Sequence, residues 1–119
     1  MILYTGTLAP HHTGLNLAWE DFFLRSQKEN GRMFLVFYEN FSSMVLGKSL
    51  EIEKEIFTDK RHPPVYRRIS GGGSVFHSKG NLNYSLFLSL ADFPELNNVT
   101  VSYQKILTAL AVSLGRHVA

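Results

Sequence analysis

The sequence predicts an α+β fold in which helices flank a central β-sheet. Apolar residues recur with helical period over 16–29 and again over 101–114, near the two ends of the chain. Between them, MFLVFYEN at 33–40 is a continuous β-branched and aromatic run of strand length, typical of a strand covered on both faces. Because 119 residues suffice for one core, we expect residues 1–119 to form a single domain.

The first part of the chain is predicted to form a strand and then a helix. Ile2–Tyr4 is a short β-prone run that Gly6 follows. Thr13 or Asn16 can cap the next helix, and Asn30-Gly31 is a typical helix stop. The polar face of this helix is expected to carry Glu20, Arg25 and Lys28.

The middle of the chain carries shorter elements. Residues 43–47 indicate a strand that enters a glycine turn, and residues 51–57 indicate a short helix or helical turn. His62-Pro63-Pro64 breaks the chain and favours an extended approach to Val65 and Tyr66.

Two further strands and a helix complete the predicted order. Residues 74–77 and 83–90 have strand character, and Gly80-Asn81 between them suits a tight hairpin turn. The helix over 101–114 is expected to end at Gly115.

Composition excludes several classes of function. Apolar residues make up 45% and charged residues 18% of the chain, an ordinary balance for a folded domain. The absence of cysteine excludes disulfides and thiolate chemistry and favours a reducing, cytoplasmic location. The chain has no run of eighteen apolar residues that would indicate a membrane span. Its basic residues are scattered and do not form a face for nucleic acid, so neither a membrane nor a nucleic acid is expected as a partner.

The segment YRRISGGGSVFHSKGNLNYS, residues 66–85, carries the strongest functional signal. Three glycines contribute no side-chain burial, but they let a ligand approach the backbone, whose N–H groups can converge on an anion. Arg67 and Arg68 can hold the same anion in a bidentate manner. The P-loop and dinucleotide patterns both fail, because Gly73 is followed by Ser-Val-Phe-His. A flexible glycine hairpin between strands is the alternative interpretation.

This segment resembles the signature of lipoate-protein ligases, in the biotin/lipoate ligase superfamily. The resemblance runs from Arg67 to His77 and continues over Gly80–Ser85. Asn16–Glu20 is similar to the early N-L-A-x-E helix of that family, and Val45–Gly47 is similar to its V-x-G turn. The similarity covers nearly the whole chain in the family's order.

The resemblance implies a mixed, largely antiparallel central sheet and a two-step reaction. ATP, with Mg²⁺, and lipoate would form lipoyl-AMP, and the acyl group would pass to a lysine of a lipoyl acceptor domain. The expected acceptors belong to oxoacid dehydrogenase complexes or are the glycine cleavage H protein. Lipoyl-adenylate would contact Arg68, Gly73, Ser74, Val75 and Phe76, and the supporting pocket would include Arg67, Ser70, Gly71, Gly72, His77 and Asn81.

Each of these residues also has a simpler interpretation. Arg67 can pair with a surface carboxylate. His77 has no partners at metal spacing, so we expect it to orient the pocket wall, and we expect no metal site. Asn81 can be a turn residue alone, and Trp19 and Phe22 are expected in the core.

The sequence departs from the family pattern in length. The family's lysine, which contacts the acyl-adenylate, lies on a later strand, and neither Lys79 nor Lys105 has its sequence context. We therefore expect this chain to be an N-terminal portion that has no catalytic residue of its own and that can require a separate C-terminal ligase segment. An ATP-independent octanoyl or lipoyl transferase and a non-catalytic binding module are the alternatives.

Overall fold

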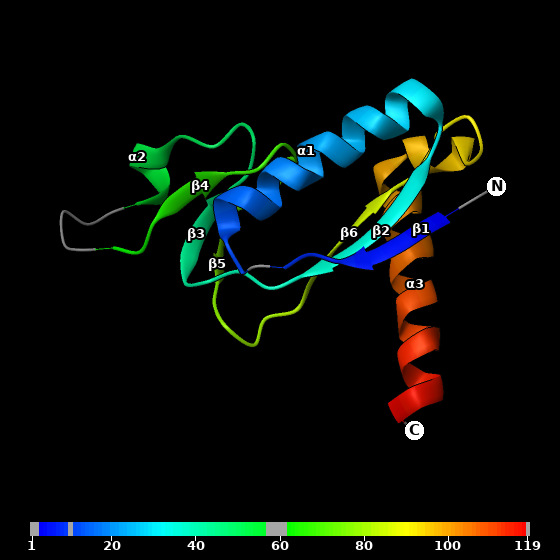
Figure 1. Cartoon of the computed structure of the whole chain (residues 1–119). Coiled ribbons are helices and arrows are strands. Elements are labelled where there is room, and N and C mark those ends of the chain that lie inside the picture. Colours follow the sequence, from blue (N-terminus) through cyan, green and yellow to red (C-terminus); the bar gives the residue numbers. More distant parts are fainter. Residues whose placement is uncertain (1–2, 10, 57–61, 119) are drawn as a thin grey trace. The chain divides into compact units, whose positions relative to one another are not determined.

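The computed structural model describes residues 3–9, 11–56 and 62–118. The chain divides into two compact units, Met1–Phe87 and Leu88–Ala119. Among the described residues, the first unit contains six strands and two helices, and the second contains a short 3₁₀ helix and a long α-helix (Figure 1).

The strands of the first unit form two three-stranded sheets. The first sheet has the order β1-β2-β6, where β1 (Leu3–Thr7) is parallel and β6 (Asn83–Phe87) antiparallel to β2 (Met33–Tyr38). The second has the order β4-β3-β5, where β4 (Val65–Arg67) is parallel and β5 (Val75–His77) antiparallel to β3 (Ser43–Leu46). The α+β class and the mixed pairing are confirmed, and the strands are shared between two sheets instead of one.

Helix α1 (Thr13–Asn30) is longer than the predicted helix and has a different N-terminal cap. The ring of His12 accepts the hydrogen bond of the Leu15 amide at 3.1 Å. Thr13, a predicted cap, is instead the first residue of the helix. It is buried, and its hydroxyl forms a hydrogen bond with the Ser43 hydroxyl at 2.8 Å. The predicted stop is confirmed, since Gly31 has φ 68° and its N–H caps the Gln27 carbonyl.

The core of the first unit lies around β2, which is central in its sheet as predicted. The fully or nearly buried apolar residues are Leu17, Met33, Val36, Tyr38, Val45, Leu46 and Phe87. Trp19 and Phe22 were expected in this core, but they are 41% and 55% exposed. Both rings instead contact other aromatic rings of α1, including Phe23, along the helix surface.

The predicted hairpin through Gly80-Asn81 is wrong, although the turn itself forms. Gly80 has φ 93°, and the Asn81 amide bonds the Ser78 carbonyl at 3.1 Å. The flanking strands then pair with different partners, β5 with β3 and β6 with β2. A turn reverses the chain locally but does not choose the pairing, which the neighbouring apolar strands decide.

The short helix α2 (Ile52–Glu55) agrees with the helical turn predicted over 51–57, of which Phe57 lies outside the described residues. The predicted strand over 2–4 is β1, and Ile2 also lies outside the described residues.

The second unit consists of η1 (Pro94–Asn97) and α3 (Val99–Val118). The side chain of Asn98 accepts from the Val101 amide at 3.1 Å at the start of α3. The predicted stop at Gly115 is wrong, because α3 continues through it to Val118. Gly115 has no positive φ, and one interior glycine costs a helix only about 1 kcal/mol. Among the described residues, no helix is long and apolar enough to span a membrane.

Candidate functional site

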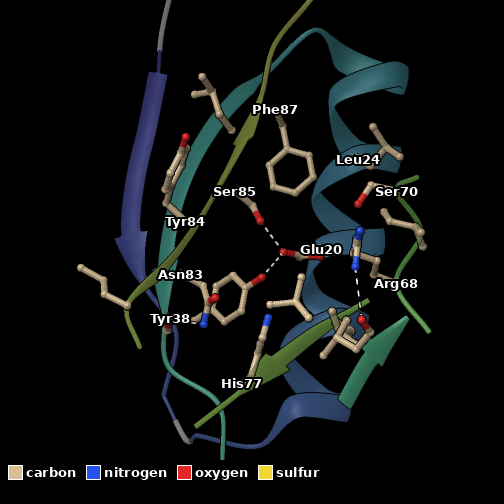
Figure 2. A pocket seen from close by; sticks show the side chains of 16 residues that line it. Glu20, Leu24, Tyr38, Arg68, Ser70, His77, Asn83, Tyr84, Ser85 and Phe87 are labelled. Atoms are coloured by element: carbon tan, nitrogen blue, oxygen red, sulfur yellow. Dashed lines mark hydrogen bonds between the residues drawn. The ribbon is translucent and has the colours of Figure 1, made fainter. Parts of the chain in front are cut away.

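A cavity of about 600 Å³ lies in the first unit, with walls from α1, from both sheets and from the segment after β4 (Figure 2). Its lining is largely apolar and includes Leu17, Leu24, Val45, Ile69, Val75, Leu82, Leu86 and Phe87. The polar members are Glu20, Tyr38, Arg68, Ser70, His77, Asn83, Tyr84 and Ser85. Such a site, lined by apolar and polar residues in equal number, suits a small molecule that has both characters.

Arg68 is the cation of this wall, and the glycine segment holds its side chain. One terminal nitrogen, Nη2, donates to the carbonyls of Gly71 and Gly73, both at 2.8 Å. The other, Nη1, donates to the Val45 carbonyl at 3.4 Å. A guanidinium has five N–H groups, so two of them have no hydrogen-bond partner in the described part of the chain.

The glycine segment approaches a neighbouring turn closely. Gly72 has φ 101°, a conformation that favours glycine. A β-carbon added to Gly47 would lie 2.1 Å from the Gly72 carbonyl oxygen, so the two backbones are in direct contact. At Gly71 and Gly73, an added β-carbon would meet nothing within 4 Å. Space is therefore open beside the α-carbons of these two residues.

His77 is fixed by a chain of amides that starts on α1. Asn16 donates its side-chain amide to the Asn40 side-chain oxygen at 2.9 Å and to the Glu39 carbonyl at 3.1 Å. This fixes the Asn40 amide so that its nitrogen faces Nδ1 of His77 at 2.8 Å. Since an amide nitrogen only donates, Nδ1 accepts and the imidazole proton lies on Nε2.

The surroundings of His77 favour its neutral form. Burial and the nearby charge of Arg68 lower the pKa of His77, and the charge of Glu20 opposes them. A neutral imidazole adds no charge to the wall beside Arg68. That His77 orients the pocket wall for a ligand stays a prediction.

A carboxylate stands among the apolar lining residues. Glu20 is only 6% exposed, and its Oε1 accepts from the Tyr38 hydroxyl at 2.6 Å and from the Ser85 hydroxyl (Figure 2). Burial, and then the charge of Glu20, raise the pKa of Tyr38, so this phenol stays protonated and donates. Glu20 was predicted on the polar outer face of its helix, and that prediction is wrong.

The structure brings only some of the predicted site residues to the cavity. Arg68, Ser70, Val75 and His77 line it. Phe76 lies outside its lining and is 50% exposed, as strand alternation between Val75 and His77 requires.

Three other predicted residues make contacts outside the cavity lining. Arg67 donates to the carbonyls of Gly47, Lys48 and Leu50, and among the described residues it pairs with no carboxylate of the kind considered from the sequence. Ser74 donates to Glu55 at 2.5 Å. The Asn81 amide donates to the Ser78 carbonyl, and the Asn81 carbonyl accepts from the side chain of Asn83 at the start of β6.

Sequence reasoning missed the cavity roles of Glu20, Tyr38 and Ser85. A local signal existed only for Glu20, which follows the apolar residues Leu17 and Trp19 in the segment similar to the family's N-L-A-x-E pattern. Within the described part of the chain, no three His, Asp or Glu side chains gather in a way that could hold a metal ion.

The sequence matches the family described as the lipoyl protein ligase A/B catalytic domain over residues 12–118. The chain belongs to this family, which confirms the resemblance drawn from the glycine segment. Lipoate–protein ligase 1 of Staphylococcus aureus is 38% identical over 104 residues, which cover 85% of this chain and 31% of that protein.

Two solved structures share the fold. The bipartite lipoate protein ligase of Thermoplasma acidophilum, described with its E2 lipoyl domain, has a TM-score of 0.66 at 27% identity and covers 91% of this chain and 46% of its own. A lipoate-protein ligase A bound with ATP has a TM-score of 0.65 at 28% identity, and the match covers 91% of this chain and 48% of that one. The chain thus spans about a third to a half of the length of these relatives.

Proposed function

We propose that this chain belongs to an ATP-dependent lipoate-protein ligase, which activates lipoate as lipoyl-AMP and transfers the lipoyl group to a lysine of a lipoyl acceptor domain. The observation that carries the proposal is Arg68 in the wall of a largely apolar cavity, a cation with two N–H groups that bond none of the described residues. The family match and the relative bound with ATP support it.

The proposed first step joins two anions, and the site offers the charge that this step needs. A lipoate carboxylate oxygen attacks the α-phosphorus of ATP, a mixed anhydride forms, and pyrophosphate leaves. The guanidinium of Arg68 would offset the repulsion between carboxylate and phosphate and stabilise the charge of the transition state. The apolar lining of the cavity would take the acyl chain.

We assign the adenylate to the β5 edge of the second sheet. β5 is one of the two edge strands in the order β4-β3-β5, so its outer backbone groups have no strand partner among the described residues. In this assignment Gly73, Ser74, Val75 and Phe76 contact the nucleotide through their backbone, and Ser70, Gly71 and Gly72 shape the turn before it. Mg²⁺ would arrive with the ATP phosphates, and the assignment gives it no ligand from this chain.

In the second proposed step, the amine of the acceptor lysine attacks the acyl carbonyl and AMP leaves. The acceptor would be a lipoyl domain of an oxoacid dehydrogenase complex or the glycine cleavage H protein; the Thermoplasma relative described with an E2 lipoyl domain supports this class. A cytoplasmic location is part of the same proposal. Residues 1–119 would be the N-terminal part of one catalytic domain, which a lysine-bearing segment would complete.

An ATP-independent octanoyl or lipoyl transferase is the second candidate, because the matched family includes both A-type and B-type proteins by its description. A non-catalytic binding module is the third. Release of pyrophosphate from ATP in the presence of lipoate separates the ligase from both.

Calorimetric titration with a non-hydrolysable lipoyl-adenylate mimic tests the proposed site in the 119-residue chain. We expect micromolar binding, at least tenfold weaker in Arg68→Ala, which equals about 1.4 kcal/mol. Arg25→Ala is the matched control, because Arg25 is 73% exposed and pairs with Asp21 on α1. No binding by a wild-type chain that circular dichroism shows to be folded would refute the proposed site.

A further inference from the structure

Arg67 and Arg68 are adjacent, but their side chains contact different backbone segments. Arg68 lines the cavity, whereas the Nη1 atom of Arg67 donates to three carbonyls of the turn after β3. These carbonyls belong to Gly47, Lys48 and Leu50, at 3.1, 3.2 and 2.5 Å from Nη1. We name residues 47–50 the β3 turn and residues 70–73 the glycine turn.

The backbone of the β3 turn packs directly against the backbone of the glycine turn. The Lys48 amide donates to the Ser70 carbonyl at 2.9 Å. Gly47 lies so close to the Gly72 carbonyl that no β-carbon fits between them. A displacement of the β3 turn therefore moves Ser70 and Gly72, because packed backbones have no free space to absorb it.

The glycine turn determines where the guanidinium of Arg68 lies in the cavity wall. Gly71 and Gly73 accept both hydrogen bonds of Nη2 of Arg68, and Ser70 is itself a lining residue. Contacts thus run without a break from the guanidinium of Arg67, through the two turns, to the guanidinium of Arg68.

We infer that Arg67 is a positioning residue, which holds the β3 turn against the glycine turn and thereby sets the place of Arg68 in the cavity wall. It acts without touching the ligand. The consequence for ligand binding rests on the proposed function, whereas the effect on the two turns does not depend on it.

The geometry also specifies which substitutions are tolerated. A single nitrogen of Arg67 makes all three contacts, and a lysine ammonium is likewise one nitrogen, with three donors. Arg67→Lys therefore keeps the function of this residue, whereas Arg67→Ala loses it. Arg68 uses two nitrogens in a fixed fork, so Arg68→Lys does not replace it.

Amide hydrogen exchange and binding of the lipoyl-adenylate mimic test this inference in the same four proteins: wild type, Arg67→Ala, Arg67→Lys and Arg25→Ala. In Arg67→Ala we expect at least tenfold faster exchange of the Lys48 and Leu50 amides, which bond Ser70 and Gly47. We also expect tenfold weaker binding. Arg67→Lys and Arg25→Ala remain within threefold of wild type in both measurements.

Three results overturn the inference. The first is unchanged exchange in Arg67→Ala with weaker binding, which makes Arg67 a direct ligand contact. The second is faster exchange in Arg67→Ala with unchanged binding. The third is an Arg67→Lys variant that folds but does not keep exchange and binding close to those of wild type. If wild type does not bind the mimic, the proposed function fails, and exchange of the Lys48 and Leu50 amides then decides alone whether Arg67 holds the β3 turn against the glycine turn.

Discussion

Substitution of Gly47 by alanine tests the contact between the two turns most directly. The new β-carbon would lie 2.1 Å from the carbonyl oxygen of Gly72, whereas ordinary contacts begin at 3.4 Å. The backbones must therefore separate by more than 1 Å, which breaks the hydrogen bond between Lys48 and Ser70 and displaces the acceptors of Arg68. Two or three lost hydrogen bonds at about 1 kcal/mol each, with the strain of overpacking, predict a loss of about 3 kcal/mol.

Urea unfolding of Gly47→Ala and Gly71→Ala measures this loss against a control in the adjoining turn. Gly71 has open space around an added β-carbon and no positive φ, so Gly71→Ala is expected to change the free energy of unfolding by less than about 0.5 kcal/mol. Equal unfolding free energies for the two variants would refute the close packing of the turns.

Two further predictions concern polar groups of the cavity. Because burial lowers the pKa of His77 in the folded state, the unfolded chain takes up the proton first as pH falls, and the unfolding free energy decreases from pH 7.5 to 5.5. Urea unfolding at both pH values should show a smaller decrease in His77→Gln, and an equal decrease would contradict this account. Glu20→Ala leaves the hydroxyls of Tyr38 and Ser85 without their acceptor and is expected to lower the unfolding free energy by about 1 to 3 kcal/mol. Asp21→Ala at the neighbouring position is the matched control, because the side chain of Asp21 is 40% exposed and bonds only the exposed Arg25 among the described residues. A loss in Glu20→Ala no larger than in this control would disprove the buried network.

The sequence predicted the elements whose determinants are local. The helix end at Gly31 follows from the left-handed conformation that glycine adopts there. The strand Met33–Tyr38, predicted over 33–40, follows from an unbroken apolar run, and its central position agrees with the burial of both faces. The position of Val75 and His77 on one face follows from strand alternation once the strand is recognised.

Features that depend on distant partners were not predictable in this way. Glu20 looks like a surface residue of an amphipathic helix, but its hydrogen-bond donors come from β2 and β6, 18 and 65 residues later. The Gly80-Asn81 turn has correct turn chemistry, yet the choice of strand partners depends on sheets that form elsewhere. The partners of Arg67 are carbonyls without any sequence signature.

The combination of two arginines and three glycines can be explained from these contacts. β4 ends at Arg67, and the two adjacent side chains serve different backbone segments, so one residue fixes the β3 turn while the next lines the cavity. Gly72 supplies the positive φ and leaves room for Nη2 of Arg68, which would lie 2.9 Å from an added β-carbon. Gly71 and Gly73 present carbonyls to the same nitrogen and keep their backbone open. The glycines therefore do more than provide flexibility, because they let an exposed turn hold a guanidinium at the wall of a largely apolar cavity.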